Sequence, residues 1–478
     1  MKVNHNISAM ISSDNLLRNE GLLANSVERL SSGYKINHAK DHPSGMAISI
    51  KMRAQIRGLD QAETNADSGN SVLETADGAM GEMSSILQRM RELSVQAASA
   101  TTTPSDRAII QEEIDSLTEE ITRISEDTEF NSLSLLNGDL NTHTYTNSNY
   151  ATVFDTNRVN EGKYQILVTS DATQASVTTG TTTAVSEEGV LNINGIETTI
   201  STSDSSEEVW VKLQEMAAYA GVSITSSTTT FTLGSSALTI TSDEYGNDID
   251  LNISTSNNAL AASLGLNSIG GWDSTTNEMA TVHGSDIVLS ISGATTDNEF
   301  TGSEAIYTQG QRVRILGDDG FEIRMVLTDG AAADSTTNGG ITLNVTGMGS
   351  MYLQIGANEN QGIEVEIPNL SAYALGIEGL NIQNEQGADR AIGLLDDALE
   401  YLNATRAALG AYENRLDHTI ANLDATEENM ERAISRIMDV DMAEEMTLYS
   451  NLNILTQAGT SVLAQANELP EQALQMLR

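Results

Sequence analysis

Apolar residues recur at helical spacing near both ends of the chain. From residue 59 to residue 90 the steps between them alternate three and four, through Leu59, Ala62, Ala66, Gly69, Leu73, Ala76, Met80, Met83, Leu87 and Met90. A second series runs from Ile392 to Ile437 and continues from Leu448 to Ala473. This spacing predicts long helices that each present one apolar stripe to other helices. Matching stripes at both ends predict that the two termini pack side by side.

The middle of the chain, residues 139–347, has a different pattern. Thr, Ser, Gly and Asn dominate, and short runs alternate apolar with polar residues, which is typical of strands. Expected strands are 230–233, 237–241 and 312–316, with 321–327 as the hairpin partner of the last, and expected local units are a strand–turn–strand at 191–200 and a helix at 206–220. We therefore expect one or two small β-rich domains here.

A third zone opens at residue 348 with a predicted β-hairpin, MYLQIGANENQGIEVEI, at 351–367. Ile363, Val365 and Ile367 point to one side, whereas Glu364 and Glu366 point to the other. The predicted fold is mainly α. Both chain termini form a long antiparallel helical bundle or coiled coil, and a β-rich outer domain is inserted between them.

Composition narrows the function classes. The chain has 478 residues with 24 basic and 67 acidic side chains, a formal net charge of -43 that would repel nucleic acid. It has no Cys, which excludes disulfides and thiolate metal sites. No apolar run is long enough for a membrane span or a cleaved leader, so we expect no membrane insertion and, if the protein is secreted, export without a leader.

Motifs for catalysis or metal binding are weak. His38 and His42 are four residues apart, but Pro43 disfavours helix at position 42, so we interpret both as loop histidines. Asp318-Asp319 could bind calcium, although Asp is favoured in hairpin turns for backbone reasons. No phosphate-binding loop or nucleophile elbow is present. We expect no catalytic residue, no cofactor site and no metal site, and hence no enzyme.

Two surfaces are candidates for contacts with other proteins. Arg89 and Arg91 lie in LQRMREL, which is either a solvated helix face or a contact for a neighbouring subunit or a receptor. In an isolated pair of helices, part of the apolar stripe at the C-terminal end would remain exposed to water, which predicts self-association. The assembly residues we expect are Leu448, Leu452, Leu455, Val462, Leu469 and Leu477.

Several long segments resemble bacterial flagellin. They include NSVERLSSGYKINHAKDHPSGMAIS, LQRMRELSVQAA and TEFNSLSLLNG near one end, and LGAYENRLDHTIANL, AISRIMDVDMAEEM and QAGTSVLAQANELPEQALQMLR near the other. The hairpin also resembles that of the family but lies after the insert. Part of the insert, about 186–264, resembles a small β-α-β module found in flagellar proteins.

The resemblance implies a domain plan. Residues 1–44 and 436–478 would be the terminal helices of an inner tube. Residues 45–138 and 348–435 would form the surrounding helical domain, and 139–347 the variable outer insert. Gly33, Pro43 and Gly45 would then lie in the spoke that joins the inner and surrounding layers, which makes this stretch a joint and not a catalytic loop.

The resemblance also implies function and partners. The protein would be a secreted structural subunit that polymerises into the extracellular flagellar filament used for motility. An export chaperone would hold its C-terminal helices, and cap and hook-junction proteins would be neighbours. Toll-like receptor 5 would recognise the monomer through Arg89, Leu93 and Glu113, with Gln88 and Arg91 beside them. The alternatives are a hook-filament junction protein and a filament subunit with an adhesive outer domain.

Overall fold

The computed structural model describes residues 6–157, 159–291, 298–317, 321–346 and 348–476. The chain packs into two compact units. Unit 1 comprises residues 1–69, 353–363 and 415–478, and unit 2 comprises residues 70–352 and 364–414. Two long helices, α2 (Pro43–Ala97) and α8 (Glu385–Met438), contribute residues to both units. The domain limits predicted from sequence stay predictions.

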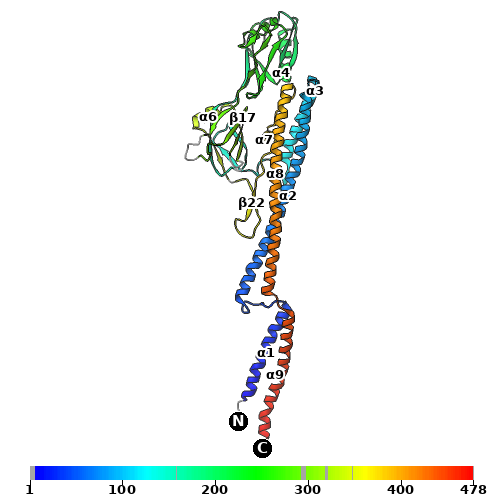
Figure 1. Ribbon diagram of the computed structural model, residues 1–478, viewed down its shortest axis with the longest axis vertical. Helices are drawn as coiled ribbons and strands as arrows, with labels where there is room; N and C mark the ends of the chain where they lie inside the picture. The colour runs from blue at the N-terminus through cyan, green and yellow to red at the C-terminus, as the bar shows by residue number, and fades with distance from the viewer. Residues whose placement is uncertain (1–5, 158, 292–297, 318–320, 347, 477–478) are drawn as a thin grey trace. The chain divides into compact units, whose positions relative to one another are not determined.

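Unit 1 contains the antiparallel pair formed by α1 (Ile7–Ser32) and α9 (Met442–Met476), the blue and red helices of Figure 1. At one end of the pair, Nδ2 of Asn6 donates to the carbonyl of Ala466 at 2.7 Å. At the other end, the backbone of Lys35 donates to Met438 at 2.7 Å, and that of Val440 donates to Gly33 at 3.0 Å. The two chain termini therefore pack side by side, as the two apolar stripes predicted.

The tip of the β21–β22 hairpin belongs to unit 1 as well. The strands are β21 (Met351–Gln354) and β22 (Gly362–Val365), which confirms the predicted hairpin. Ala357 of the tip packs on a small core of Leu59, Ala62 and Leu423. Space there is tight, because a Cβ at Gly58 would lie 3.0 Å from the Cβ of Ala357.

The helices of unit 2 share an apolar core. Residues 70–97 of α2, helix α3 (Pro104–Asp127) and residues 385–414 of α8 bury the side chains of Met80, Met83, Leu87, Met90, Leu93, Ile114, Ile121, Leu395, Leu402 and Leu409. Thr103 caps α3 with a capping box to Asp106. Arg107 closes the turn between α2 and α3, since its Nε donates to the carbonyl of Ala97 at 2.8 Å.

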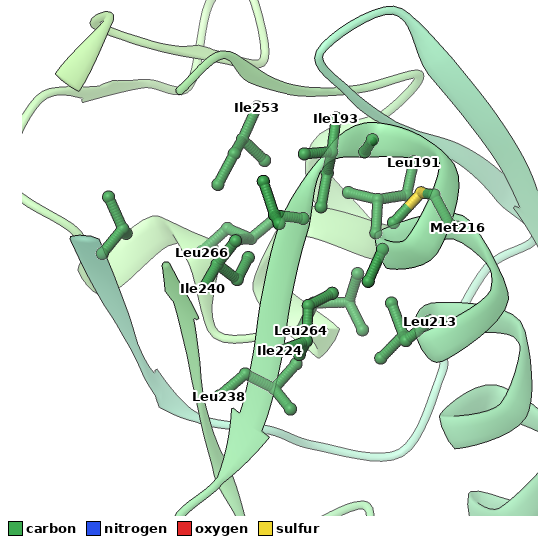
Figure 2. Packing of buried hydrophobic residues seen from close by; sticks show 14 of the residues in the cluster. Leu191, Ile193, Leu213, Met216, Ile224, Leu238, Ile240, Ile253, Leu264 and Leu266 are labelled. Carbon is green, nitrogen blue, oxygen red and sulfur yellow. The ribbon is translucent and has the colours of Figure 1, made fainter. Parts of the chain in front are cut away.

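The β-rich part of unit 2 has two cores. One core lies between helix α4 (Ser206–Ala220) and the sheets β13-β14-β12-β7-β8 and β6-β10-β9 (Figure 2). The strands of these sheets are β6 (Gln174–Thr181), β7 (Gly189–Ile193), β8 (Ile196–Ile200), β9 (Val222–Ser226), β10 (Ala237–Tyr245), β12 (Ile253–Thr255), β13 (Trp272–Asp273) and β14 (Glu278–Met279). The predicted strand–turn–strand at 191–200 and the predicted helix at 206–220 are confirmed.

The second core lies between the four-stranded sheets β16-β5-β20-β3 and β17-β18-β19-β4. Their strands are β3 (Thr144–Thr146), β4 (Ala151–Asn157), β5 (Gly162–Ser170), β16 (Val288–Ile291), β17 (Ala305–Gln309), β18 (Arg312–Leu316), β19 (Glu322–Leu327) and β20 (Ile341–Val345). Strands β18 and β19 pair antiparallel, which confirms the predicted hairpin.

The remaining elements of unit 2 are short. They are β1 (Glu129–Phe130), β2 (Leu133–Ser134), β11 (Asp250–Leu251), β15 (Val282–His283), α5 (Asn258–Ser263), the 3-10 helix η1 (Leu266–Ser268), α6 (Ala331–Asn338) and α7 (Ala372–Leu375).

The prediction of a strand at 230–233 is wrong. These residues form a connection whose backbone donors are satisfied by serine hydroxyls. The amide of Thr232 donates to Ser236 Oγ at 3.0 Å, and that of Leu233 donates to Ser206 Oγ at 3.2 Å. Phe231 is buried and its ring stacks on Trp210, with 5.2 Å between the centroids. Phe231 is therefore apolar because it packs against α4, and not because it belongs to a strand.

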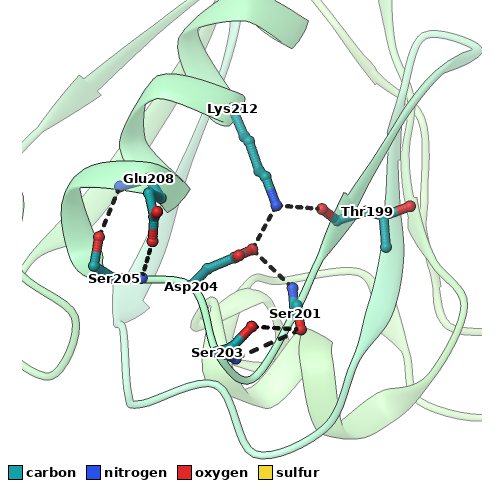
Figure 3. Close-up of polar contacts among 7 residues, drawn as sticks. All are labelled: Thr199, Ser201, Ser203, Asp204, Ser205, Glu208 and Lys212. Carbon is teal, nitrogen blue, oxygen red and sulfur yellow. Dashed lines mark hydrogen bonds and ion pairs between the residues drawn. The ribbon is translucent and has the colours of Figure 1, made fainter.

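The N-terminus of α4 is held by polar contacts (Figure 3). Ser205 and Glu208 form a capping box, with the Ser205 amide 2.7 Å from Glu208 Oε2. Lys212 donates through Nζ to Asp204 Oδ2 at 2.6 Å and to the carbonyl of Thr199 at 3.1 Å. The hydrogen bond from Lys212 is the main cause that lowers the pKa of Asp204.

Candidate assembly and contact surfaces

Apolar side chains remain exposed along the α1/α9 pair. On α1 they are Ile7, Met10, Ile11, Leu17, Leu22 and Val27, and on α9 they are Met442, Met446, Leu448, Ile454, Leu455 and Val462. A pair of helices has too little contact area to cover two broad apolar stripes, so each helix keeps part of its stripe in water. Exposed apolar surface on this scale marks a region that another protein covers.

The predicted assembly residues on α9 have different environments. Leu452 is 6% exposed and packs within the pair, whereas Leu448, Leu455 and Val462 are 43%, 50% and 52% exposed. Leu469 lies within α9. Leu477 lies outside the described residues. The exposed members of this set are available for contacts with another chain, and Leu452 contributes to the fold of the monomer.

Buried polar groups accompany the apolar contacts in the same pair. Glu445 of α9 is 6% exposed, and its Oε2 lies 3.8 Å from Nη1 of Arg29 on α1. This ion pair is too long for a good hydrogen bond. Oε1 of Glu445 and Oγ of the buried Ser26 have no hydrogen-bond partner among the described residues. The monomer therefore leaves polar as well as apolar groups of this pair incompletely satisfied.

The predicted spoke connects α1 to α2. Gly33 ends α1 with a φ of +74°, a left-handed conformation that glycine adopts without strain. Asp41 Oδ2 accepts from the amide of His38 at 2.9 Å, and this bond is the main cause that lowers the pKa of Asp41. Nζ of Lys35 donates to the carbonyl of Arg436 at 2.7 Å. The connection is held at several points along its length.

His42 and Pro43 start helix α2. Pro43 is the first helical residue, a position that tolerates proline because its amide would have no partner there. Nδ1 of His42 accepts from the amide of Gly45 at 2.8 Å, so the imidazole acts as the cap of the helix. A Cβ at Gly45 would lie 2.6 Å from that nitrogen, which explains the glycine. His38 instead pairs with Glu28, at 2.9 Å from Nε2 to Oε1.

Arg89 and Glu113, 24 residues apart in the sequence, are brought together in unit 2. Nη2 of Arg89 lies 2.9 Å from Glu113 Oε1, which joins α2 to α3 and raises the pKa of Arg89. Both side chains and that of Gln88 are exposed. Leu93 is only 2% exposed and packs in the helical core. The structure therefore places Arg89, Gln88 and Glu113 on the surface, with Leu93 buried in the core.

Arg91 already has a partner within the chain. Its Nη2 lies 3.3 Å from Oδ2 of Asp396, so the guanidinium joins α2 to α8. A second pair has the same role, because Nε of Arg406 on α8 lies 2.8 Å from Oδ1 of Asp77 on α2. Sequence reasoning missed Asp396, Asp77 and Arg406, since no local pattern indicates which residues meet across two helices 300 positions apart.

Asp155 is at the centre of a buried polar network in unit 2. The Tyr401 hydroxyl of α8 donates to its Oδ2 at 2.7 Å, and Nδ2 of Asn141 donates to its Oδ1 at 3.0 Å. Arg324 of β19 stacks over the Tyr401 ring at 3.8 Å from the centroid and pairs with Glu322 at 2.6 Å. Burial raises the pKa of Asp155 and raises that of Tyr401 well above its ordinary value. The sequence carried no signal for this network.

This network lines a cavity of about 710 Å³ in unit 2. Two of its arginines, Arg314 and Arg324, pair with Glu322, and its walls come from β18, β19 and α8. Within the described ranges, no group of three or more His, Asp or Glu side chains is arranged to hold a metal ion. Asp318 and Asp319 lie outside the described residues. In the described part of the chain, no helix combines the length and hydropathy needed to cross a lipid bilayer.

Comparison with known proteins matches both ends of the chain. The bacterial flagellin N-terminal helical region matches residues 3–141, and the bacterial flagellin C-terminal helical region matches residues 392–477. Flagellin A of Vibrio anguillarum is 32% identical over 100% of this chain and 99% of that protein. The B-type flagellin of Pseudomonas aeruginosa is 34% identical over 100% of both chains. The solved FliC structure from Burkholderia pseudomallei is 20% identical, covers 73% of this chain and 99% of that chain, and has a TM-score of 0.24.

Helical termini, a β-rich middle and full-length identity above 30% show that the chain belongs to the bacterial flagellin family. The protein is a structural subunit of the flagellar filament, which lies outside the cell. Full-length similarity to flagellins favours this function over that of a hook-junction protein.

Proposed function

We propose that α1 and α9 carry the assembly of the filament. The observation behind this proposal is the apolar surface that the α1/α9 pair leaves in water, which includes Leu448, Leu455 and Val462. Burial against neighbouring copies would stabilise the polymer by about 25 cal/mol for each Å² of apolar area removed from water. The spoke residues Gly33, Pro43 and Gly45 would fix the direction in which α2 leaves this pair.

Two valines of nearly equal exposure test this assignment. Val462 on α9 is 52% exposed and Val288 on β16 is 54% exposed. We expect Val462→Asp to block growth from filament seeds, because a carboxylate would be buried between subunits. Val288→Asp should grow as the wild type does. Equal growth of the two variants would contradict the proposed role of α9.

The exposed face of α9 also suits the other flagellar partners. A chaperone that binds the C-terminal helices before export would cover the same apolar side chains. Cap and hook-junction proteins would meet this surface at the ends of the filament. The protein acts as a structural subunit without catalysis, and its assembly needs no cofactor.

We also infer that Toll-like receptor 5 recognises the monomer through the surface of Arg89, Gln88 and Glu113. The support is the exposed pair of Arg89 with Glu113, which presents a planar guanidinium at a fixed position. Leu93 would contribute indirectly, because its buried side chain holds α2 in place below this surface. Arg91 would position α2 through its contact with Asp396.

Receptor activation by purified monomer tests this surface. We expect Arg89→Ala and Glu113→Ala each to lower potency about tenfold, the loss that removal of an interface anchor causes. Arg123→Ala is the matched control, because Arg123 is also exposed and ion-paired on this helical region. A potency of Arg89→Ala equal to that of the wild type would exclude this surface.

A further inference from the structure

The charge of the chain reverses sign along α2. Residues 29–58 contain six basic side chains and one acidic one, in a protein whose net charge is -43. Residues 59–88 contain six acidic side chains and no Lys or Arg. The boundary between the two segments falls within unit 1. This part of the molecule therefore carries a strong positive region directly beside a strong negative one.

The part of the positive region that lies on α2 is exposed. Among the residues that the structure describes, Lys51, Arg53 and Arg57 form no ion pair, and all three are exposed. Ile48 and Ile50 beside them are 47% and 58% exposed. Apolar side chains left in water among unpaired cations indicate a surface that is covered by an acidic partner. We name residues 48–57 the basic segment.

The negative region is formed by two helices of unit 1. Leu59 and Ala62 of α2 pack with Leu423 and Met430 of α8. This packing brings together carboxylates of the two helices, and we name these six residues the acidic face: Asp60, Glu63, Asp67, Asp424, Glu427 and Glu431. The pKa of Glu63 is raised, first by lost hydration and then by Asp424, Asp67 and Glu427. The pKa of Glu427 is raised by lost hydration and by Asp60. The monomer thus gathers carboxylates that repel one another.

We propose that the basic segment of one subunit docks on the acidic face of a neighbouring copy in the filament. This inference rests on the filament function and names the surfaces that subunits use outside the α1/α9 pair. The two regions differ on one chain, so the contact is heterologous and can repeat without end, as a filament requires. The three basic side chains of α2 and its three acidic ones are centred about ten residues apart, so parallel neighbours would pair them after a shift of roughly 15 Å.

Charge reversal tests the proposed contact with full-length protein grown on filament seeds. Lys51→Glu with Arg57→Glu places two carboxylates on the basic segment, and Glu63→Lys with Glu427→Lys places two ammonium groups on the acidic face. We expect each double variant to raise the critical concentration for growth at least tenfold. The four substitutions together keep the net charge at -43 and should restore growth to within threefold of the wild type.

Controls distinguish loss of this contact from three other causes of poor growth: loss of folding, a change in net charge, and a wrong filament function. Lys163→Glu, an exposed lysine on β5, should grow normally. If a reversed variant loses helix content by circular dichroism, Lys51→Gln with Arg57→Gln replaces it and must still raise the critical concentration. Normal growth of both reversed variants, or no rescue in the fourfold variant, would overturn the contact while leaving the filament function intact. Failure of the wild type to grow would contradict the filament function.

Discussion

Asp155 is a carboxylate that is 4% exposed and accepts hydrogen bonds from Tyr401 and Asn141. Desolvation raises its pKa above the ordinary value of 3.8 because a buried negative charge loses its hydration. Between 3.8 and the raised pKa, the folded protein binds more protons at this site than the unfolded chain does. The stability that Asp155 contributes is therefore fully present below about pH 3.8 and is lost as the pH rises through the raised pKa.

Asp155→Asn should remove this pH dependence. The amide stays neutral, so the local opening free energy of residues 151–157 should no longer fall as the pH rises above 3.8. Hydrogen exchange of the monomer measures that free energy for the segment. Asp139→Asn, an exposed carboxylate, should keep the wild-type slope. An unchanged slope in Asp155→Asn would show that another group carries it.

His42 caps α2 through a ring nitrogen, which is an uncommon choice for this position. His42→Ala should destabilise the monomer by about 1 kcal/mol, because the amide of Gly45 loses its acceptor. His42→Asn should retain most of the stability, since an asparagine oxygen can accept the same bond. Urea denaturation compares the three proteins, and equal stability of the Ala and Asn variants would contradict the capping role.

Pro43 follows the cap and restricts the backbone of the spoke. We expect Pro43→Ala to lower the stability of unit 1 by about 0.4–1 kcal/mol, because the unfolded chain gains conformational freedom. The variant should also change the shape or the melting temperature of the filament, since the joint becomes less restricted. Electron microscopy and calorimetry of assembled filaments measure both, and the stiffening role fails if neither changes.

At the scale of elements, two ion pairs fix the register of α2 against α8 in unit 2. Asp77 and Arg406 are about one third exposed, so solvent screens their attraction. A double-mutant cycle with Asp77→Ala and Arg406→Ala should give a coupling energy of about 0.5–1 kcal/mol. The exposed pair of Glu428 and Arg432 on α8 should couple more weakly. A coupling energy near zero for the first pair would show that apolar packing alone sets the register.

The sequence predicts helices better than it predicts the contacts between them. Steps of three and four residues identify α2, α8 and α9, because a helix repeats its buried face at that spacing. The partner of Arg91 cannot be found in this way, since Asp396 becomes its neighbour only through the antiparallel register. The alternation of apolar and polar residues also gives a wrong strand prediction around Phe231, because this apolar residue packs on helix α4 and no strand forms.

The candidate receptor surface shows how far the sequence predicts contacts between helices. Arg89 and Glu113 were expected together from the family resemblance, and the structure joins them. Leu93 was also expected to be a receptor contact, yet its side chain is buried, as its place three residues after Met90 on the apolar stripe of α2 indicates. Burial depends on which other helices pack on α2, and that information lies in distant parts of the chain.

At the scale of the whole molecule, we propose that the terminal helices carry assembly and that the receptor surface lies in unit 2, which also contains the buried network of Asp155. Apolar side chains of the α1/α9 pair remain exposed in the monomer, whereas those of the helical core in unit 2 are buried. This difference is what a polymerising subunit needs, because a fully satisfied surface gains little from association.

The most direct test compares the full chain with a version trimmed to residues 36–440, both added to filament fragments and followed by electron microscopy. The trimmed chain lacks α1 and α9 and keeps α2, α3 and the β-rich part. We predict that only the full chain extends the fragments into long filaments. Growth of the trimmed chain would contradict the assignment of assembly to the terminal helices.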